Sequence, residues 1–142
     1  MAKLTTPPAL SISPVKAYFI AAKARQFDVK DGLTDPESGS NGSDDGMRSV
    51  LEDRSDDPVL FELTSFIHDM NEDEQIDLVA LAWLGRGDGE IENWRELRAE
   101  AARAHNKRTA RYLLGMPMLA DYLEEALSKF GHSPEEVEAD IL

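Results

Sequence analysis

Residues 71–85 read NEDEQIDLVALAWLG, and this stretch decides the fold. Asn71 followed three residues later by Glu74 is the pattern of a helix capping box. The apolar side chains after it occupy more than one side of the expected helix, which is typical of a helix in the middle of a bundle. We therefore expect a central helix that begins after Asn71, buries Trp83 in the core and ends at Gly85, a natural left-handed cap.

The segments on both sides of this stretch are also helical in pattern, with apolar residues three and four apart. No stretch alternates with a period of two over the length of a strand. We predict an all-α protein, a single compact bundle of about six to eight short helices. Apart from the central one, the expected helices cover residues 14–27, 58–70, 94–106, 109–115 and 117–130, with Thr109 as a cap, Met118 inside, and a last short helix after Ser133.

Two segments lack such a pattern. Residues 1–12 are expected to form a loose N-terminal tail, and residues 28–57 carry ten acidic and three basic residues, a net charge of −7. We expect a single helical domain at 13–142 that contains a flexible, mobile acidic loop at about 28–57. Residues 41–52 nearly match a calcium-binding loop. An arginine at its eighth position and the lack of an entering helix favour a solvated acidic loop instead.

Composition excludes several classes of protein. The 142 residues include no cysteine, which rules out a disulfide scaffold, a thiolate metal site and a cysteine nucleophile. The formal net charge of −13 works against binding to nucleic acid or to an anionic membrane. No segment approaches the ~20 apolar residues of a membrane span. We expect a cytoplasmic protein with no membrane partner.

Sequence motifs for catalysis or metal binding are weak. The loop GRGDG at 85–89 lacks the Lys-Ser/Thr of a phosphate loop, and no serine lies in a nucleophile elbow. The three histidines, His68, His105 and His132, fall on different expected elements and do not share the spacing of zinc ligands. We predict no catalytic residue, no metal ligand and no cofactor.

Residues 103–111, RAHNKRTAR, form the one strongly basic stretch of the chain. We call its four cations, Arg103, Lys107, Arg108 and Arg111, the basic island. Three interpretations remain open: a solvated turn that balances nearby acids, a contact surface for an acidic partner, or a site for a phosphate-bearing molecule. The acidic partner in the second interpretation includes the chain's own acidic loop, in cis or from a second subunit.

The stretch from 71 to 127, which contains LVALAWLGRGD and YLLGMPMLADYLEE, resembles a family of small alphaproteobacterial proteins defined as a domain of unknown function. Upstream, DPESGSNGSDDG and DDPVLFEL are similar to the N-terminal half of the same family. The resemblance implies a bacterial origin and a compact helical domain. It carries no activity and no assigned site residue.

These observations lead to two functional hypotheses. The first is a non-enzymatic helical protein-interaction module of the bacterial cytoplasm, which docks another protein, or a second copy of itself, through its charged surface. The alternative is a domain that binds a small-molecule anion or a phosphate ligand, with an enzyme as one form of it. In both, the basic island is the expected contact site.

Overall fold

The computed structural model describes residues 8–32, 58–133 and 135. These residues contain six α-helices and one 3-10 turn and no strand, which confirms the predicted all-α bundle. The elements are α1 (Pro14–Gly32), α3 (Pro58–His68), α4 (Glu72–Arg86), the 3-10 turn Ile91–Asn93, α5 (Trp94–Ala104), α6 (Thr109–Leu114) and α7 (Leu119–Lys129).

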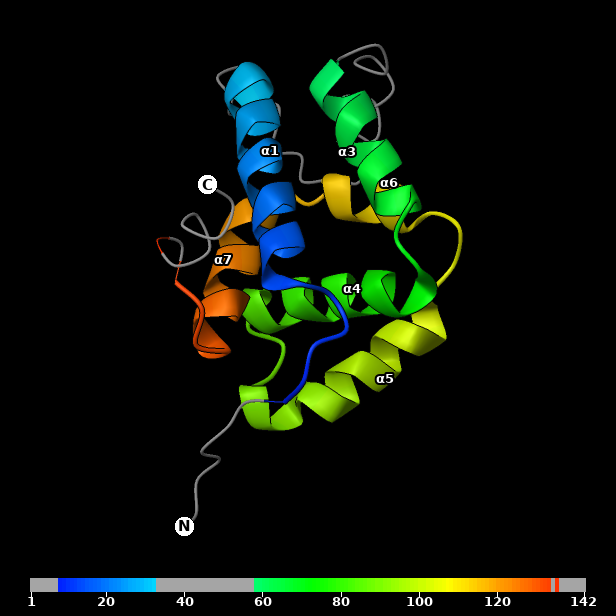
Figure 1. Cartoon of the computed structure of the whole chain (residues 1–142), viewed down its shortest axis with the longest axis vertical. Helices are drawn as coiled ribbons and strands as arrows, with labels where there is room; N and C mark the ends of the chain where they lie inside the picture. Colours follow the sequence, from blue (N-terminus) through cyan, green and yellow to red (C-terminus); the bar gives the residue numbers. More distant parts are fainter. Residues whose placement is uncertain (1–7, 33–57, 134, 136–142) are drawn as a thin grey trace.

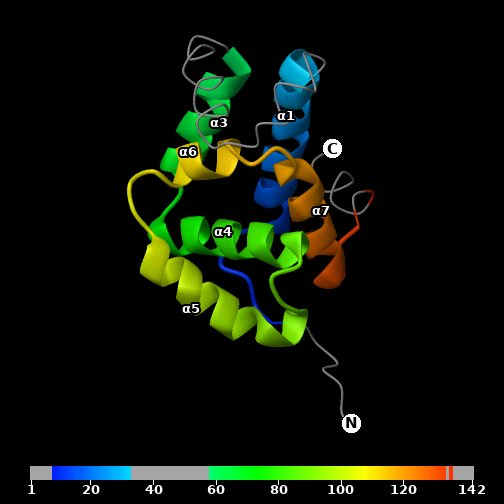
Figure 2. The same ribbon diagram turned by 180° about the vertical axis from the view of Figure 1, so that it is seen from behind.

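Helix α4 runs through the middle of the molecule, as its sequence predicts (Figures 1 and 2). Helices α1, α3 and α6 lie on one side of α4, α5 lies on the other, and α7 packs beside α1. The predicted capping box is present: the Glu74 N–H donates to Asn71 Oδ1 at 2.8 Å, and the Asn71 N–H donates to Glu74 Oε1 at 3.0 Å. Both bonds satisfy amides that have no partner inside the helix.

The end of α4 differs from the prediction. Gly85 does not cap the helix but lies inside it, against the backbone of α7. A Cβ atom at Gly85 would lie 1.8 Å from the carbonyl oxygen of Tyr122, so only glycine allows the two helices to approach this closely. The left-handed cap is Gly87, at φ 100°, and its N–H donates to the carbonyl oxygens of Trp83 and Leu84. Gly85, which the sequence predicts as the cap of the helix, instead allows α4 and α7 to pack closely.

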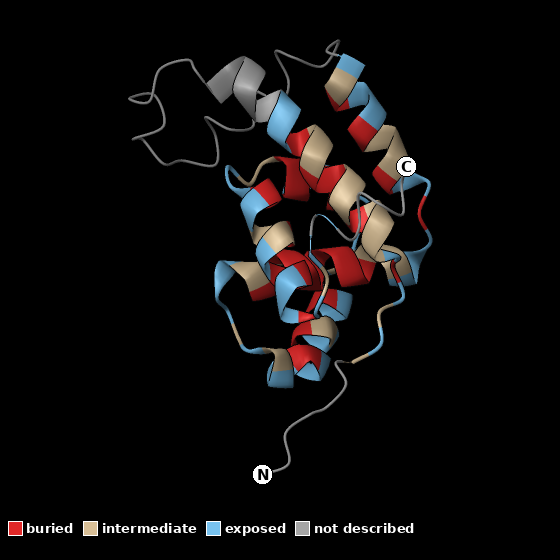
Figure 3. Cartoon of the chain, turned by 60° about the vertical axis from the view of Figure 1, so that its left-hand side comes forward, coloured by how far each residue is buried: buried red, intermediate tan, exposed pale blue. Residues whose placement is uncertain are grey.

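The buried apolar side chains form one hydrophobic cluster to which every helix contributes. Buried residues follow the inward faces of the helices and exposed residues the outward faces (Figure 3). Ion pairs from Arg25 to Asp121, at 3.0 Å, and to Glu124, at 2.8 Å, connect α1 with α7 at the surface. Two expected core residues are less buried than predicted, because Trp83 is only partly covered and Met118 is 49% exposed.

The N-terminal segment is also more ordered than the sequence suggests. Residues 8–12 were expected in a loose tail, but the Ile12 side chain is 1% exposed. The backbone N–H groups of Ser11 and Ile12 both donate to the carboxylate of Asp77, which is completely buried in α4. The Arg98 guanidinium on α5 donates to the other oxygen of the same carboxylate. A buried carboxylate needs such donors, and the N-terminal segment supplies two of them.

Helix α1 continues to Gly32, five residues beyond its predicted end at residue 27. Residues 33–57, which hold the rest of the acidic loop and the calcium-like stretch, lie outside the described residues. The same is true of the N-terminal residues 1–7 and of almost all of the predicted last helix.

Candidate functional site

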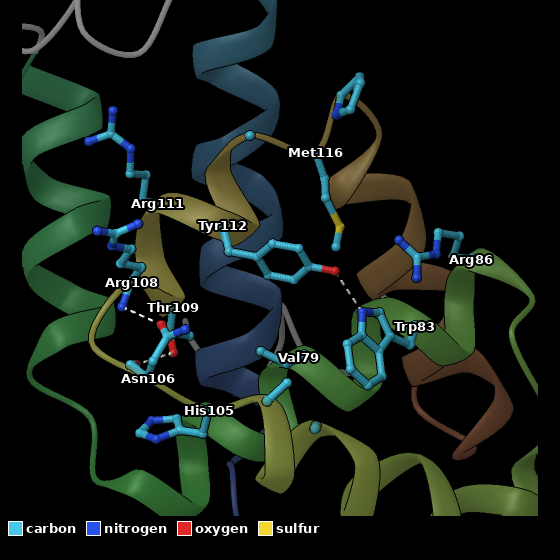
Figure 4. A pocket seen from close by; sticks show the side chains of 14 residues that line it. Val79, Trp83, Arg86, His105, Asn106, Arg108, Thr109, Arg111, Tyr112 and Met116 are labelled. Atoms are coloured by element: carbon cyan, nitrogen blue, oxygen red, sulfur yellow. Dashed lines mark hydrogen bonds between the residues drawn. The ribbon is translucent and has the colours of Figure 1, made fainter. Parts of the chain in front are cut away.

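A pocket of about 700 Å³ lies where α4, the end of α5 and α6 meet (Figure 4). Helix α4 supplies Val79, Trp83 and Arg86, which are spaced four and three residues apart and therefore share one side of the helix. The turn after α5 and helix α6 supply most of the other side chains. Those with polar or aromatic groups are His105, Asn106, Arg108, Thr109, Arg111 and Tyr112.

The pocket is basic, although the chain as a whole is strongly acidic. Arg86, Arg108 and Arg111 line it together with His105, and no aspartate or glutamate is among the lining residues. The formal net charge of the chain is −13. A concave site with charges of one sign concentrates the field of those charges, because its walls have a low dielectric constant. The lining therefore favours an anion.

The structure divides the basic island. Arg108 and Arg111 line the pocket, whereas Arg103 and Lys107 do not. Arg103 is largely exposed and pairs with Glu100 on its own helix at 2.7 Å. This division arises because α5 ends at Ala104 and the chain turns before α6 begins, so neighbours in sequence face different directions.

A short turn fixes the position of Arg108. Asn106 Oδ1 accepts the backbone N–H of Arg108 at 2.7 Å, and the Thr109 hydroxyl donates to the Asn106 carbonyl oxygen at 3.1 Å. Thr109 was predicted to cap α6 with its side chain, but it is the first helical residue and Arg108 takes the cap position. The Thr109 hydroxyl stabilises the turn before α6 and does not cap the helix.

His105 is held by Gln75 of α4. The Gln75 amide nitrogen donates to the carbonyl oxygens of Ile67 and Met70, both at 3.1 Å, so its oxygen faces His105. That oxygen lies 2.9 Å from His105 Nε2 and must accept, which places the proton of the neutral imidazole on Nε2. His105 Nδ1 lies 3.8 Å from the carboxylate of Glu72.

The two aromatic side chains of the pocket are joined by a hydrogen bond. The Trp83 indole N–H donates to the Tyr112 hydroxyl at 2.8 Å, a bond between α4 and α6 that is visible in Figure 4. Next to them, Arg86 makes two hydrogen bonds to the Asp88 carboxylate, at 3.2 and 2.6 Å. Asp88 raises the pKa of Arg86 above its ordinary value and offsets its charge. The charge that an anion would meet therefore comes chiefly from Arg108, at the other end of the pocket.

Sequence reasoning identified Arg108 and Arg111 but missed the other half of the lining. Trp83 was assigned to the core, and Arg86 and Tyr112 were not considered as site residues. A signal was present, because Arg108, Arg111 and Tyr112 share the spacing of one helix face, as do Trp83 and Arg86. The sequence does not show that these two faces lie opposite each other.

The part of the chain that the structure describes contains neither a cluster of metal ligands nor a membrane-spanning helix. No group of three or more histidine, aspartate or glutamate side chains there is placed to hold a metal ion. No helix within the same residues is long and apolar enough to cross a membrane.

The pocket lies within the part of the chain that matches a known protein family, and the match assigns it no role. Residues 61–132, half of the chain, match the family described as proteins of unknown function, DUF3775. This range includes every residue that lines the pocket. No curated protein and no solved structure matches the chain. The chain therefore belongs to the DUF3775 family of proteins of unknown function.

Proposed function

We propose that the protein is a non-enzymatic binding module and that its pocket binds a small anionic ligand. The observation that carries this proposal is the lining: three arginines and a histidine with no acidic residue, in a chain of net charge −13. A volume of about 700 Å³ lies within the roughly 300–1,000 Å³ typical of small-molecule sites. Of the two hypotheses drawn from the sequence, this geometry favours the anion-binding one.

Arg108 is the residue best suited to hold the anion. No ion pair or side-chain hydrogen bond engages its guanidinium among the residues that the structure describes, and the Asn106 turn fixes its backbone. A guanidinium makes two parallel hydrogen bonds to a phosphate or a carboxylate. Each hydrogen bond to a charged group typically contributes about 1.5–3 kcal/mol.

The lining offers groups for binding rather than for covalent chemistry. It contains no carboxylate, serine or cysteine, and the Thr109 hydroxyl is already donated to the Asn106 carbonyl. The resemblance described above implies a bacterial origin, and the sequence pattern predicts the cytoplasm as the location in which the module works.

A thermal-shift experiment tests the proposal. A ligand present at ten times its Kd stabilises the folded state by about 1.4 kcal/mol, which raises the melting temperature of a domain of this size by about 3–5 °C. We expect inorganic phosphate to produce such a rise relative to chloride at equal ionic strength. Arg108→Glu should abolish the rise.

Arg103→Glu is the matched control, because it makes the same change of charge within the basic island but outside the pocket. It should preserve the response to phosphate. An equal loss in both variants would mean that net charge, and not the pocket, governs binding. The absence of any response in the wild-type protein up to its solubility limit in phosphate would refute the proposal.

The docking of a partner protein is the second candidate function, and one observation favours it. Tyr112, at the pocket, is 44% exposed, and the exposed Met118 follows Pro117 of the lining. Tyrosine, methionine and arginine are all enriched at protein interfaces. An acidic segment of another protein, or of a second copy of this chain, would fit the same surface.

Binding experiments with the same pair of variants test this candidate. A partner captured from lysate should bind, once purified, to the wild type and to Arg103→Glu but not to Arg108→Glu, and added salt should weaken the complex. For a second copy, the molar mass should fall from dimer to monomer as salt rises. Equal binding of the partner to all three proteins would contradict docking of a partner at the pocket. A monomer at every protein and salt concentration would contradict docking of a second copy.

A further inference from the structure

The pocket combines two kinds of lining, and the combination narrows the class of ligand. We propose that the ligand is an aromatic anion, a small molecule whose ring packs against Trp83 and Tyr112 while its anionic group pairs with Arg108. This inference rests on the proposed function and names the ligand class of the same pocket.

The volume of the pocket is the first reason. A water molecule occupies about 30 Å³ of liquid, so about 700 Å³ corresponds to more than twenty waters. An inorganic phosphate would displace only a few of them and leave most of the pocket filled with solvent. A ligand that makes full use of the pocket has a body as well as a charged group.

The state of the two aromatic side chains is the second reason. The Trp83 N–H is already donated to the Tyr112 hydroxyl, so the indole has no further hydrogen bond to offer a ligand. Apart from the hydroxyl of Tyr112, the two residues offer the apolar surface of their rings. Tyr112 is 44% exposed and Trp83 is partly exposed, so ring surface is accessible from the pocket.

The arrangement of the lining is the third reason. Figure 4 shows Arg108, Arg111 and His105 on one side of the Tyr112 ring, and Trp83 and Arg86 on the other. Tyr112 points from α6 toward Trp83, whereas Arg108, at the cap position before α6, extends to the other side (Figure 4). A ligand that contacts both side chains therefore carries its ring at one end and its anionic group at the other.

The hydrogen bond between Trp83 and Tyr112 also keeps the aromatic part in place. It connects the central helix α4 with the short helix α6, at 2.8 Å. The buried side chain of Val79, one turn before Trp83 on α4, supplies further apolar surface. The pocket thus has an ordered apolar wall beside its cationic end, which suits a flat ring.

Calorimetric titration of the full chain with three probes tests the inference. The probes are phenyl phosphate, inorganic phosphate and phenol. We expect phenyl phosphate to bind about tenfold more tightly than inorganic phosphate, a typical effect of stacking one ring on an aromatic side chain. Phenol, which lacks the anion, should show no saturable binding at the same concentrations.

Three variants test which pocket residues account for the binding of phenyl phosphate. Tyr112→Leu should lower the affinity for phenyl phosphate toward that for inorganic phosphate, because only Trp83 then remains to contact the ring. Tyr112→Phe keeps the ring and removes the hydroxyl, so it should retain most of the preference for phenyl phosphate. Arg108→Glu should abolish the binding of both anions. Circular dichroism melting of each variant confirms that it is folded before the titration.

The outcomes separate this inference from the function on which it rests. If both anions bind with equal affinity, the ligand class is wrong and the anion-binding function stands. If phenol binds as tightly as phenyl phosphate, Arg108 does not select the ligand and the inference fails. If neither anion binds, the proposed function and the inference fail together.

Discussion

Replacement of Gly85 by alanine tests the most unusual packing contact of the fold. The added Cβ would lie 1.8 Å from the Tyr122 carbonyl oxygen and 2.5 Å from its carbonyl carbon, where ordinary contacts are 3.4–4 Å. Because these atoms belong to the backbone of α7, no side-chain rotation relieves the overlap. Helices α4 and α7 would have to separate by more than an ångström.

The magnitude follows from two opposing effects. Overpacking of a core typically costs about 1–3 kcal/mol, and a clash between two backbones lies at or above the top of that range. Alanine in place of glycine inside a helix returns about 1 kcal/mol. We therefore expect Gly85→Ala to lower the free energy of unfolding by about 2–4 kcal/mol, measured by urea denaturation.

Gly89→Ala is the matched control for this experiment. A Cβ at Gly89 would meet only ordinary contacts, at 3.4–3.5 Å. The unfolding free energy of the Gly89→Ala protein should therefore differ from that of the wild type by less than ~0.5 kcal/mol. Gly87→Ala should cost about 1–2 kcal/mol, because its φ of 100° is unfavourable for a residue with a Cβ. A Gly85→Ala protein as stable as the wild type would refute the packing argument.

Three further substitutions are expected to lower the free energy of unfolding. Asp77→Asn should cost about 2–4 kcal/mol in urea denaturation, because it removes the buried charge that Arg98 pairs with. Glu74→Gln should be destabilising near neutral pH, since hydrogen bonds from Lys16 and the Asn71 amide lower the pKa of Glu74. Because the pKa of Glu74 is lower in the folded than in the unfolded protein, its charge stabilises the fold above the unfolded-state pKa of about 4.3. This stability is lost as the pH falls through the folded-state pKa. The difference in unfolding free energy between wild type and Glu74→Gln should therefore shrink below about pH 4. Trp83→Ala should cost about 1–3 kcal/mol by thermal unfolding, less than the ~3–5 kcal/mol of a fully buried aromatic residue, because the ring is partly exposed.

The sequence predicts those parts of the fold that local interactions determine. The Asn71 capping box and the apolar run after it are set by residues within a few positions of each other, and both were predicted correctly. The end of the same helix was not. Gly85 packs inside the helix against the backbone of Tyr122, which lies more than thirty residues away in the chain, and the sequence does not show this contact.

The candidate site shows the same limit. Arg108 and Arg111 stand out because they are cations in a run without acids, which is a local property. The bond between Trp83 and Tyr112 joins residues 29 positions apart, and the donors that reach Asp77 from the N-terminal segment lie 65 and 66 positions away. Partners of this kind become visible only when the helices are packed. For the same reason, the sequence does not reveal that the basic island divides between pocket and outer surface.

The central claim, that this pocket binds anions, is tested most directly by the two indole N–H resonances of the protein in an NMR titration with phosphate. Trp83 lines the pocket, whereas Trp94 is buried against Phe130 and serves as an internal control. If the pocket binds anions, the Trp83 resonance should shift in a saturable manner while that of Trp94 stays in place. Arg108→Glu should remove the shift, and Arg103→Glu should not. A Trp83 resonance that does not move, or that moves equally in the Arg108→Glu protein, would contradict anion binding in this pocket.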